Sequence, residues 1–360
     1  MRVSASVRKR LSADFSLDAD VVLEPGITIL FGASGSGKTT LLRCLAGLAT
    51  PEAGCVSTGD RLLFDAGRGV NVAVQHRRVG HVAQGLALFP HMTVGANIQY
   101  GLAGLDPVSA RSRVCAIADS FHIAHLLERR PGETSGGERQ RTALARSLVT
   151  DPDLLLLDEP LSALDHSTQS RIMTDLLAWN AARHIPILYV THAHREVFAL
   201  GQRVLVLEQG RIVADGTPQD VMTSPAHEAI AQLAGFENIL SATVTAIRQE
   251  AGTMECRVSG TSIDMEVPLS STPVGTPVRL AIRAGDILVA TESPRGISAR
   301  NVLPGTVRAI RQEGTTVIAA VDTGHLFEVH VTPGARSALG LEVGRRVWLV
   351  IKTHSCRLVT

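Results

Sequence analysis

Hydrophobic positions follow two different patterns along the chain. Before about residue 236, short runs that are apolar throughout alternate with longer stretches of helical periodicity. We expect buried strands at 27–31, 154–157 and 187–191, and a hairpin of 204–208 with 211–214. Because a strand that is apolar on both faces is typical of a parallel sheet covered by helices, this part predicts an α/β fold.

The remaining residues of this part complete the expected elements. Residues 1–31 resemble short strands around a turn at Glu24-Pro-Gly26. A helix is expected to follow residue 40, and another at 164–182. Residues 94–130 are mostly helical in pattern, with a break at 101–107 where glycine and proline occur. Glycine and proline interrupt helices, so the helical pattern is expected to be broken there.

After about residue 236 the chain has short strands with turn signals every 8–12 residues, a pattern of all-β domains. It also contains a repeat. The segment 242–250, Ala-Thr-Val-Thr-Ala-Ile-Arg-Gln-Glu, returns at 305–313 as Gly-Thr-Val-Arg-Ala-Ile-Arg-Gln-Glu, and 278–283 is echoed at 347–352. We therefore expect one β domain at 236–360 built from two copies of a small unit, at about 237–296 and 297–360.

Composition limits the classes of function. A chain of 360 residues is expected to form two or three domains. Its net charge of +1 and aromatic content of 3% argue against a nucleic-acid partner. Five scattered cysteines suggest reduced thiols and neither a disulfide framework nor a zinc site. The first residues do not resemble a signal peptide and no apolar run is long enough to span a bilayer, so a membrane role is expected to come through a partner.

A glycine-rich loop follows the strand expected at 27–31 and precedes a helix. It fits the spacing Gly-x-x-x-x-Gly-Lys-Thr, in which backbone N–H groups and a helix N-terminus surround a phosphate. Lys38 is expected to reach the β- and γ-phosphates of ATP, and the Thr39 hydroxyl to ligate Mg²⁺. The residues expected to hold the phosphates are Gly32, Ala33, Ser34, Gly35, Ser36, Gly37, Lys38, Thr39 and Thr40.

Two further segments carry candidate chemistry. Asp158 and Glu159 end the apolar strand 154–157, where a carboxylate faces the ligand crevice of a parallel sheet. Asp158 is expected to hold Mg²⁺, and Glu159 to accept a proton from the attacking water or to orient it. The sequence Ser135-Gly136-Gly137-Glu138 lies before a helix and offers N–H groups to a second phosphate contact.

In this order, the motifs resemble those of the ATPase subunit of ATP-binding cassette (ABC) transporters, over residues 1 to about 235. The resemblance implies a P-loop fold with a helical subdomain at about 85–150. It assigns Gln84 to a mobile loop that senses the γ-phosphate and Mg²⁺, Asp165 to the nucleotide-contacting loop after Glu159, and His192 to the switch histidine. It further implies a homodimer with ATP between two copies, a transmembrane permease dimer, a periplasmic oxyanion-binding protein, and a peripheral location on the cytoplasmic face of the bacterial inner membrane.

The chain departs from the family pattern at two places. Thr134 and Glu138 replace the usual Leu and Gln of the signature. The family also has an aromatic residue about 20 positions before the glycine loop, which stacks on adenine. Here Phe15 is the aromatic residue in that region, and we expect it to lie in a strand with its ring in the core.

The tail contains Ile297-Ser-Ala-Arg-Asn-Val-Leu-Pro-Gly305, Val331-Thr-Pro, Leu339-Gly-Leu-Glu-Val-Gly344 and Val347-Trp-Leu-Val-Ile-Lys352. With these segments, residues 297 to 360 resemble the small OB-like molybdate-binding modules (Mop or TOBE) of molybdate-importer ATPases. By that resemblance Ser298, Arg300 and Lys352 are candidate oxyanion ligands, since a hydroxyl and two cations suit a tetrahedral dianion. The leading hypothesis is therefore an ATPase that uses ATP and Mg²⁺ to power molybdate import, with molybdate also bound at the tail. The alternatives are the same machinery for tungstate or sulfate, and a non-transport ABC ATPase of DNA repair or translation.

Overall fold

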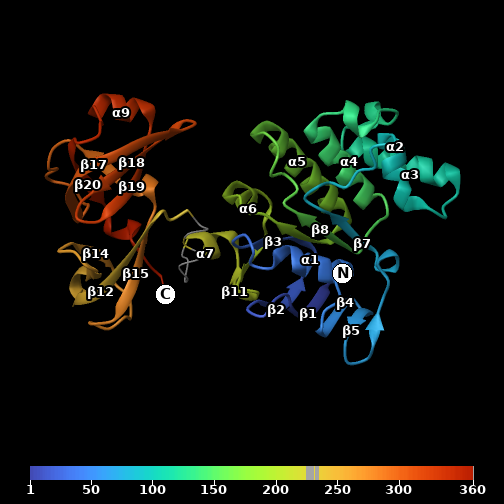
Figure 1. Cartoon of the computed structure of the whole chain (residues 1–360), viewed down its shortest axis with the longest axis horizontal. Coiled ribbons are helices and arrows are strands. Elements are labelled where there is room, and N and C mark those ends of the chain that lie inside the picture. The colour runs from blue at the N-terminus through green and yellow to red at the C-terminus, as the bar shows by residue number, and fades with distance from the viewer. Residues whose placement is uncertain (224–230, 232–234, 360) are drawn as a thin grey trace. The chain divides into compact units, whose positions relative to one another are not determined.

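The computed structural model describes residues 1–223, 231 and 235–359. It divides the chain into two compact units, Met1–Val221 and Met222–Thr360, which are treated separately below (Figure 1). The domain boundary expected between residues 235 and 236 stays a prediction, since most residues just before it lie outside the described part of the chain.

The central sheet of the first unit has six strands in the order β11-β10-β3-β9-β8-β7. All neighbouring pairs are parallel except the hairpin of β10 and β11. Every residue of β8 and β9 is buried, which confirms the sequence-based expectation for the apolar runs. The strand bounds are β3 Gly26–Phe31, β7 Val79–Val82, β8 Leu154–Asp158, β9 Pro186–Val190, β10 Arg203–Glu208 and β11 Arg211–Gly216.

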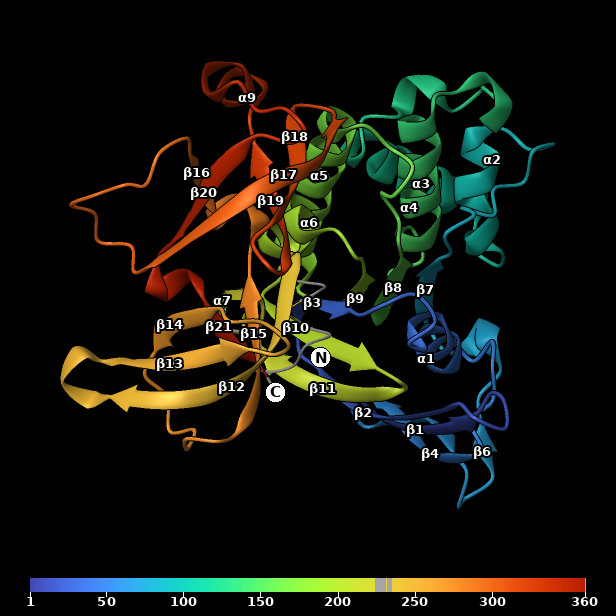
Figure 2. The ribbon, with the colours of Figure 1, turned by 60° about the vertical axis from the view of Figure 1, so that its left-hand side comes forward.

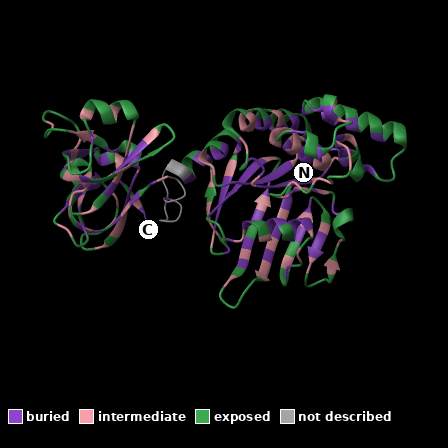
Figure 3. Cartoon of the chain, turned by 45° about the horizontal axis from the view of Figure 1, so that its top comes forward, coloured by how far each residue is buried: buried purple, intermediate pink, exposed green. Residues whose placement is uncertain are grey.

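A second, antiparallel sheet has the strand order β2-β1-β4-β5-β6. Its first strands alternate between buried and more exposed positions, as Figure 3 shows by the change of colour along each strand. Helix α1 (Lys38–Ala46) lies between the two sheets, and its apolar side chains share one core with both of them. The strand bounds are β1 Val3–Arg10, β2 Ser16–Leu23, β4 Ala53–Thr58, β5 Arg61–Asp65 and β6 Val70–Asn71.

Helices occupy the region 94–130, for which the sequence predicts a helical pattern with a break, and most of them are short. Asp106 caps α3 by accepting hydrogen bonds from the N–H groups of Val108 and Ser109, and the preceding glycine-containing turn separates α3 from α2. The α-helices are α2 Val94–Gln99, α3 Pro107–Ser120, α4 Gly136–Leu148, α5 His166–Arg183, α6 His194–Leu200 and α7 Pro218–Thr223. The 3-10 helices are η1 Val74–His76, η2 Tyr100–Leu102, η3 Ala124–Leu126 and η4 Pro131–Glu133.

The second unit contains the predicted repeat. The first copy consists of β12 Asn238–Arg248, η5 Gln249–Ala251, β13 Thr253–Val258, β14 Asp264–Pro268, β15 Pro277–Ile282, η6 Ala284–Asp286 and β16 Leu288–Ala290. The second consists of β17 Asn301–Glu313, β18 Thr316–Asp322, β19 Leu326–Val331, α9 Pro333–Leu339, β20 Arg346–Ile351, η7 Thr353–Ser355 and β21 Arg357–Val359. In each copy the long first strand pairs with the second strand and with the fourth.

The two copies exchange their last strands. The sheets have the orders β14-β13-β12-β15-β21 and β16-β20-β17-β18-β19, so each short final strand belongs to the sheet of the other copy (Figure 2). Two buried asparagines repeat this exchange in side-chain hydrogen bonds. Asn238 bonds both backbone groups of Glu328, and Asn301 bonds both backbone groups of Glu266. One core contains apolar residues of both copies, so the repeats form a single domain.

Candidate functional site

A cavity of about 350 Å³ lies beside the glycine loop of the first unit. Its walls come from the loop before β2, the glycine loop, the segment after β7 and the end of β8. The lining residues are Leu11, Phe15, Ser34, Gly35, Gly37, Lys38, Thr39, Thr40, Gln84, Asp158 and Glu159. The structure therefore brings the predicted metal residues, Glu159 and the second half of the glycine loop to one place. The predicted residues Gly32, Ala33, Ser36 and His192 are not among the lining residues.

The glycine loop has the backbone that its sequence predicts. Helix α1 begins at Lys38, and Gly37 before it has a φ of 106°, which a residue with a side chain rarely adopts. A Cβ at Gly32 would lie 2.3 Å from the carbonyl oxygen of Leu207, so only glycine fits against β10. Both positions turn the chain sharply from the central sheet into the helix, and this leaves the N-terminus of α1 open to the cavity.

Backbone carbonyl groups of the glycine loop hold the side chain of Lys38 in place. Its Nζ donates hydrogen bonds to the carbonyl oxygens of Gly32, at 2.9 Å, and Ala33, at 2.8 Å. Burial lowers the pKa of Lys38, while the charges of Glu159 and Asp158 act in the opposite direction. The ammonium group is thus only partly compensated, and an anionic group in the cavity would complete its neutralisation.

Two buried polar groups fit a magnesium nucleotide. The Ser36 hydroxyl in the glycine loop is buried and has no hydrogen-bond partner among the described residues. Asp158 is 7% exposed, and the structure records no hydrogen bond or ion pair of its carboxylate with a described residue. Since a buried carboxylate without a partner is costly, Asp158 with the nearby Thr39 hydroxyl suits a hard cation with oxygen ligands.

Glu159 connects three loops at the edge of this cavity. Gln84 Nε2 donates to its Oε2 at 3.2 Å, and His192 Nδ1 lies 3.3 Å from its Oε1. The backbone of Glu159 has a φ of 46°, an unfavourable value for a residue with a long side chain, and its N–H donates to the carbonyl of Val190. Such strain is found at functional sites, and here it directs the carboxylate toward Gln84 and His192.

A buried hydrogen bond fixes the segment that carries His192, and sequence reasoning missed it. Tyr189 in β9 donates from its hydroxyl to Oε2 of Glu196 in α6 at 2.9 Å, and both residues are buried. Burial and the Glu196 charge raise the pKa of Tyr189 well above its usual value, so the hydroxyl keeps its proton. The bond ties both ends of the segment around His192 together.

Ser135, Gly136, Gly137, Glu138 and Asp165 are absent from the lining of this cavity. Ser135 caps α4: its N–H donates to the Glu138 carboxylate at 2.7 Å, and the Glu138 N–H donates to its hydroxyl at 3.4 Å. The hydrogen bond from the Ser135 N–H lowers the pKa of the Glu138 carboxyl group. Asp165 caps the neighbouring helix α5, and Gly137 approaches Thr168 in the first turn of that helix. These predicted nucleotide contacts therefore lie at the N-termini of α4 and α5 and form a second group, separate from the residues that line the cavity.

The prediction for Phe15 was wrong. Phe15 precedes β2, is only partly buried and lines the cavity with Leu11. A Cβ at Gly37 would lie 3.5 Å from its ring, so the ring stands directly beside the glycine loop. The cause is the turn at 11–15, where the N–H groups of Leu11 and Ser12 bond the Phe15 carbonyl and bring the ring back over the loop.

The three candidate oxyanion residues lie in the second unit and are exposed. Arg300 directly precedes Asn301, which pairs with Ile351, so it lies at the same end of this ladder as Lys352. Ser298 is two residues before Arg300 in the same loop. Arg300 and Lys352 therefore lie at one edge of the sheet of the second repeat, and Ser298 lies in the loop that leads to this edge.

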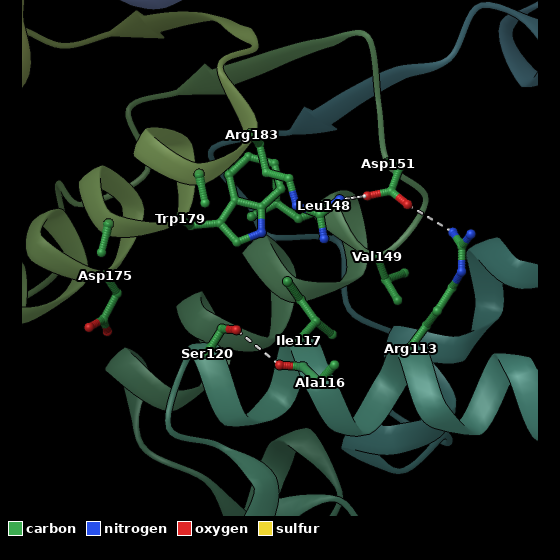
Figure 4. A pocket seen from close by; sticks show the side chains of 12 residues that line it. Arg113, Ala116, Ile117, Ser120, Leu148, Val149, Asp151, Asp175, Trp179 and Arg183 are labelled. Atoms are coloured by element: carbon green, nitrogen blue, oxygen red, sulfur yellow. Dashed lines mark hydrogen bonds and ion pairs between the residues drawn. The ribbon is translucent and has the colours of Figure 1, made fainter.

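A second cavity, of about 450 Å³, lies between α3, the end of α4 and α5 (Figure 4). Asp151 accepts hydrogen bonds from Arg113 of α3 at 3.0 Å and Arg183 of α5 at 2.6 Å. Trp179 and Ile117 contribute apolar surface. None of the predicted site residues lines this cavity. Asp151 at its wall links α3 to α5 through the two arginines.

Among the residues that the structure describes, none of the helices has the length and apolar character that crossing a membrane requires. The same part of the chain also contains no cluster of three or more His, Cys, Asp or Glu side chains arranged to hold a metal ion.

Comparison with known proteins adds family information. The ABC transporter family model matches residues 18–162, and the TOBE domain model matches residues 297–358. The molybdenum import ATP-binding protein ModC of Mesorhizobium japonicum is 38% identical over 99% of this chain and 96% of the relative. The protein of the same name from Vibrio cholerae is 35% identical over 97% of this chain and 96% of the relative.

A solved structure extends the comparison to the fold. It is described as the dimeric structure of a bacterial ABC transporter cassette, and it matches with a TM-score of 0.53 and 25% sequence identity. The match covers 61% of this chain and 99% of that chain. The α/β fold expected for the first part of the chain and the β domain expected for the tail are both confirmed.

Proposed function

This chain belongs to the ABC transporter ATPases, and we propose that it hydrolyses ATP to power import of molybdate through a membrane permease. One observation supports the ATPase chemistry above all: Lys38, Gln84, Asp158 and Glu159 line one cavity although they come from separate segments, and His192 contacts Glu159. The cargo is supported by relatives named for molybdenum import, which match along nearly the whole chain including the tail.

The residues divide the chemistry between them. The glycine loop and Lys38 bind the phosphates, and Thr39, Asp158 and Gln84 are the ligands that we assign to Mg²⁺. When bound, this ion supplies positive charge to the β- and γ-phosphates. Glu159 accepts a proton from the attacking water or orients it.

His192 has two roles in this proposal. Its ring holds the Glu159 carboxylate, and it stabilises the charge that develops on the γ-phosphate. The bond between Tyr189 and Glu196 keeps the segment of His192 in position for both.

We further propose that two copies of the chain share two ATP molecules. Ser135, Gly136, Gly137 and Asp165 are absent from the cavity of their own chain, so they are available to a nucleotide held by a second copy. Two-fold symmetry then gives two equivalent sites. The dimer would bind a transmembrane permease dimer on the cytoplasmic face of the inner membrane, and a periplasmic oxyanion-binding protein would deliver the cargo.

The tail is the second part of the proposal. Arg300 and Lys352 lie at one edge of a sheet and Ser298 in the loop that leads to it, and we assign the three to a molybdate ion that reports the cellular supply to the ATPase. Two cations and a hydroxyl provide charge and hydrogen bonds for a tetrahedral oxyanion.

Transport in vesicles tests the whole proposal. The tagged chain is purified from its own cells together with the permease that accompanies it and is reconstituted, and uptake of radiolabelled molybdate is measured with ATP. We expect uptake that depends on ATP and is competed by molybdate more strongly than by sulfate. Equal competition by tungstate or sulfate would contradict the assignment of molybdate as the transported anion. Purification without any permease would favour a non-transport ATPase.

A further inference from the structure

The two repeats of the second unit match residue by residue at the edge that carries the candidate oxyanion residues. Asn238 pairs with Ile282 in the first copy as Asn301 pairs with Ile351 in the second. The short elements that follow, η6 with β16 and η7 with β21, have equal lengths and equal spacing. The positions that correspond at this edge are Gly235 and Ser298, Glu237 and Arg300, Arg283 and Lys352, and Ala284 and Thr353.

In the first repeat this edge contains its own anion. Oε2 of Glu237 accepts a hydrogen bond from the backbone N–H of Ala284 at 2.8 Å. Arg283 follows β15 at this edge, and its guanidinium lies 4.6 Å from the centre of the Phe236 ring. In the first repeat, the carboxylate of Glu237 thus already accepts the hydrogen bond that the backbone N–H of Ala284 offers at this edge.

In the second repeat the same position has the opposite charge. Arg300 stands where Glu237 stands in the first copy, and the side chains of Arg300 and Lys352 have no recorded hydrogen bond or ion pair with a described residue. The structure also records no acceptor for the Thr353 N–H within the described part of the chain. The carboxylate recorded against this segment is Glu266, whose Oε1 accepts from the Thr353 hydroxyl at 3.3 Å.

The two edges therefore differ in the balance between carboxylates and cations. In the first copy the protein supplies a carboxylate, whereas in the second two exposed cations outnumber the single carboxylate of Glu266. We propose that the Glu237 carboxylate takes the place of an oxyanion and thereby prevents oxyanion binding at the first repeat. Each chain then binds one oxyanion, at the second repeat. This inference rests on the oxyanion site assigned under Proposed function.

The number of molybdate ions per chain tests the inference. Sodium molybdate is titrated into the full chain by isothermal calorimetry, with excess ADP present so that the glycine loop is occupied. We expect one ion per chain for the unchanged protein and two for Glu237→Arg, which removes the internal carboxylate and adds the missing cation. The reverse change, Arg300→Glu, should supply a carboxylate to the second repeat and abolish binding.

Controls separate the possible failures. Glu250→Arg makes the same charge change on the exposed helix η5, away from this edge, and should leave one ion per chain. Thermal unfolding shows whether each variant is folded, and Arg300→Glu alters only an exposed side chain. No binding by the unchanged protein would overturn the oxyanion site itself. One ion for the unchanged protein and for a folded Glu237→Arg variant would overturn only the role of Glu237, and two ions for the unchanged protein would do the same.

Discussion

Nδ1 of His192 lies 3.3 Å from Oε1 of Glu159. The other carboxylate oxygen of Glu159 accepts from Gln84 at 3.2 Å, so both oxygens are engaged by loops that follow different strands of the central sheet. A ligand that displaces Gln84 or His192 from Glu159 therefore changes the position of the carboxylate.

Changing Glu159 to Gln should separate ATP binding from hydrolysis. The amide keeps the size of the side chain but cannot accept a proton, and loss of a general base lowers rates by about 10²–10⁴-fold. We expect phosphate release to fall in that range while binding of a fluorescent ATP analogue persists. Glu24→Gln, an exposed residue paired with Arg2, is the control and should leave both unchanged. Near-normal hydrolysis by Glu159→Gln would contradict the assigned role.

Phe15 should contribute to nucleotide affinity, because its ring lines the cavity beside Gly37. Stacking of a base on an aromatic ring contributes roughly 1–3 kcal/mol, so Phe15→Ala should weaken ATP binding by about fivefold or more. Phe15→Trp should retain affinity. Phe198, an exposed aromatic residue of α6, provides the matched control as Phe198→Ala. An unchanged dissociation constant for Phe15→Ala would show that adenine does not contact the ring.

The features that could be predicted from the sequence are those that local patterns encode. Strands β8 and β9 are buried along their whole length because both faces are covered, and their apolar runs were sufficient to find them. The glycine loop was predictable because its spacing specifies its backbone, as the φ of 106° at Gly37 shows. The repeat at 242–250 and 305–313 predicted two similar units.

The features that the sequence did not reveal depend on contacts between distant segments. Strands β16 and β21 have three residues each, too few for a periodicity, and each pairs with the other repeat. The position of Phe15 follows from a turn that folds back over Gly37. The bond between Tyr189 and Glu196 joins a strand to a helix, and a buried tyrosine alone does not indicate its partner.

Arg77 should be essential for the stability of the first unit. It is 1% exposed, and its guanidinium donates to the carbonyls of Cys44 and Leu45 at the end of α1 and to Val72 and Asn71. Arg77→Met would leave these acceptors without donors, at a cost of roughly 3 kcal/mol. Urea denaturation should show the loss.

A lysine at this position would not restore the lost stability, because one ammonium group cannot reach acceptors on several sides. The exposed Arg43 on the same helix is the control, and Arg43→Met should change stability little. An Arg77→Met variant as stable as the unchanged protein would mean that water satisfies these carbonyls.

The five cysteines should fall into two classes of reactivity. Cys55 and Cys115 are exposed, whereas Cys44, Cys256 and Cys356 are buried. Burial raises the pKa of Cys44 and of Cys256 to about 11 and that of Cys356 to about 12. Since thiolates are the reactive form, Ellman's reagent should modify two thiols in the folded protein and five in denaturant. Rapid modification of more than two under native conditions would contradict the buried positions.

The same shifts predict how stability depends on pH. A thiol whose folded pKa lies above its unfolded value of about 9 keeps its proton in the folded state, while the unfolded chain releases it. The stabilising contribution is complete below pH 9 and is lost as the pH rises toward the folded value, by about 1.4 kcal/mol per pH unit and thiol. Urea denaturation of the unchanged protein and of Cys356→Ala between pH 8 and pH 11 isolates one thiol from the lysines and tyrosines that titrate in the same range. The variant should lose stability less steeply, and equal slopes would refute the shift at Cys356.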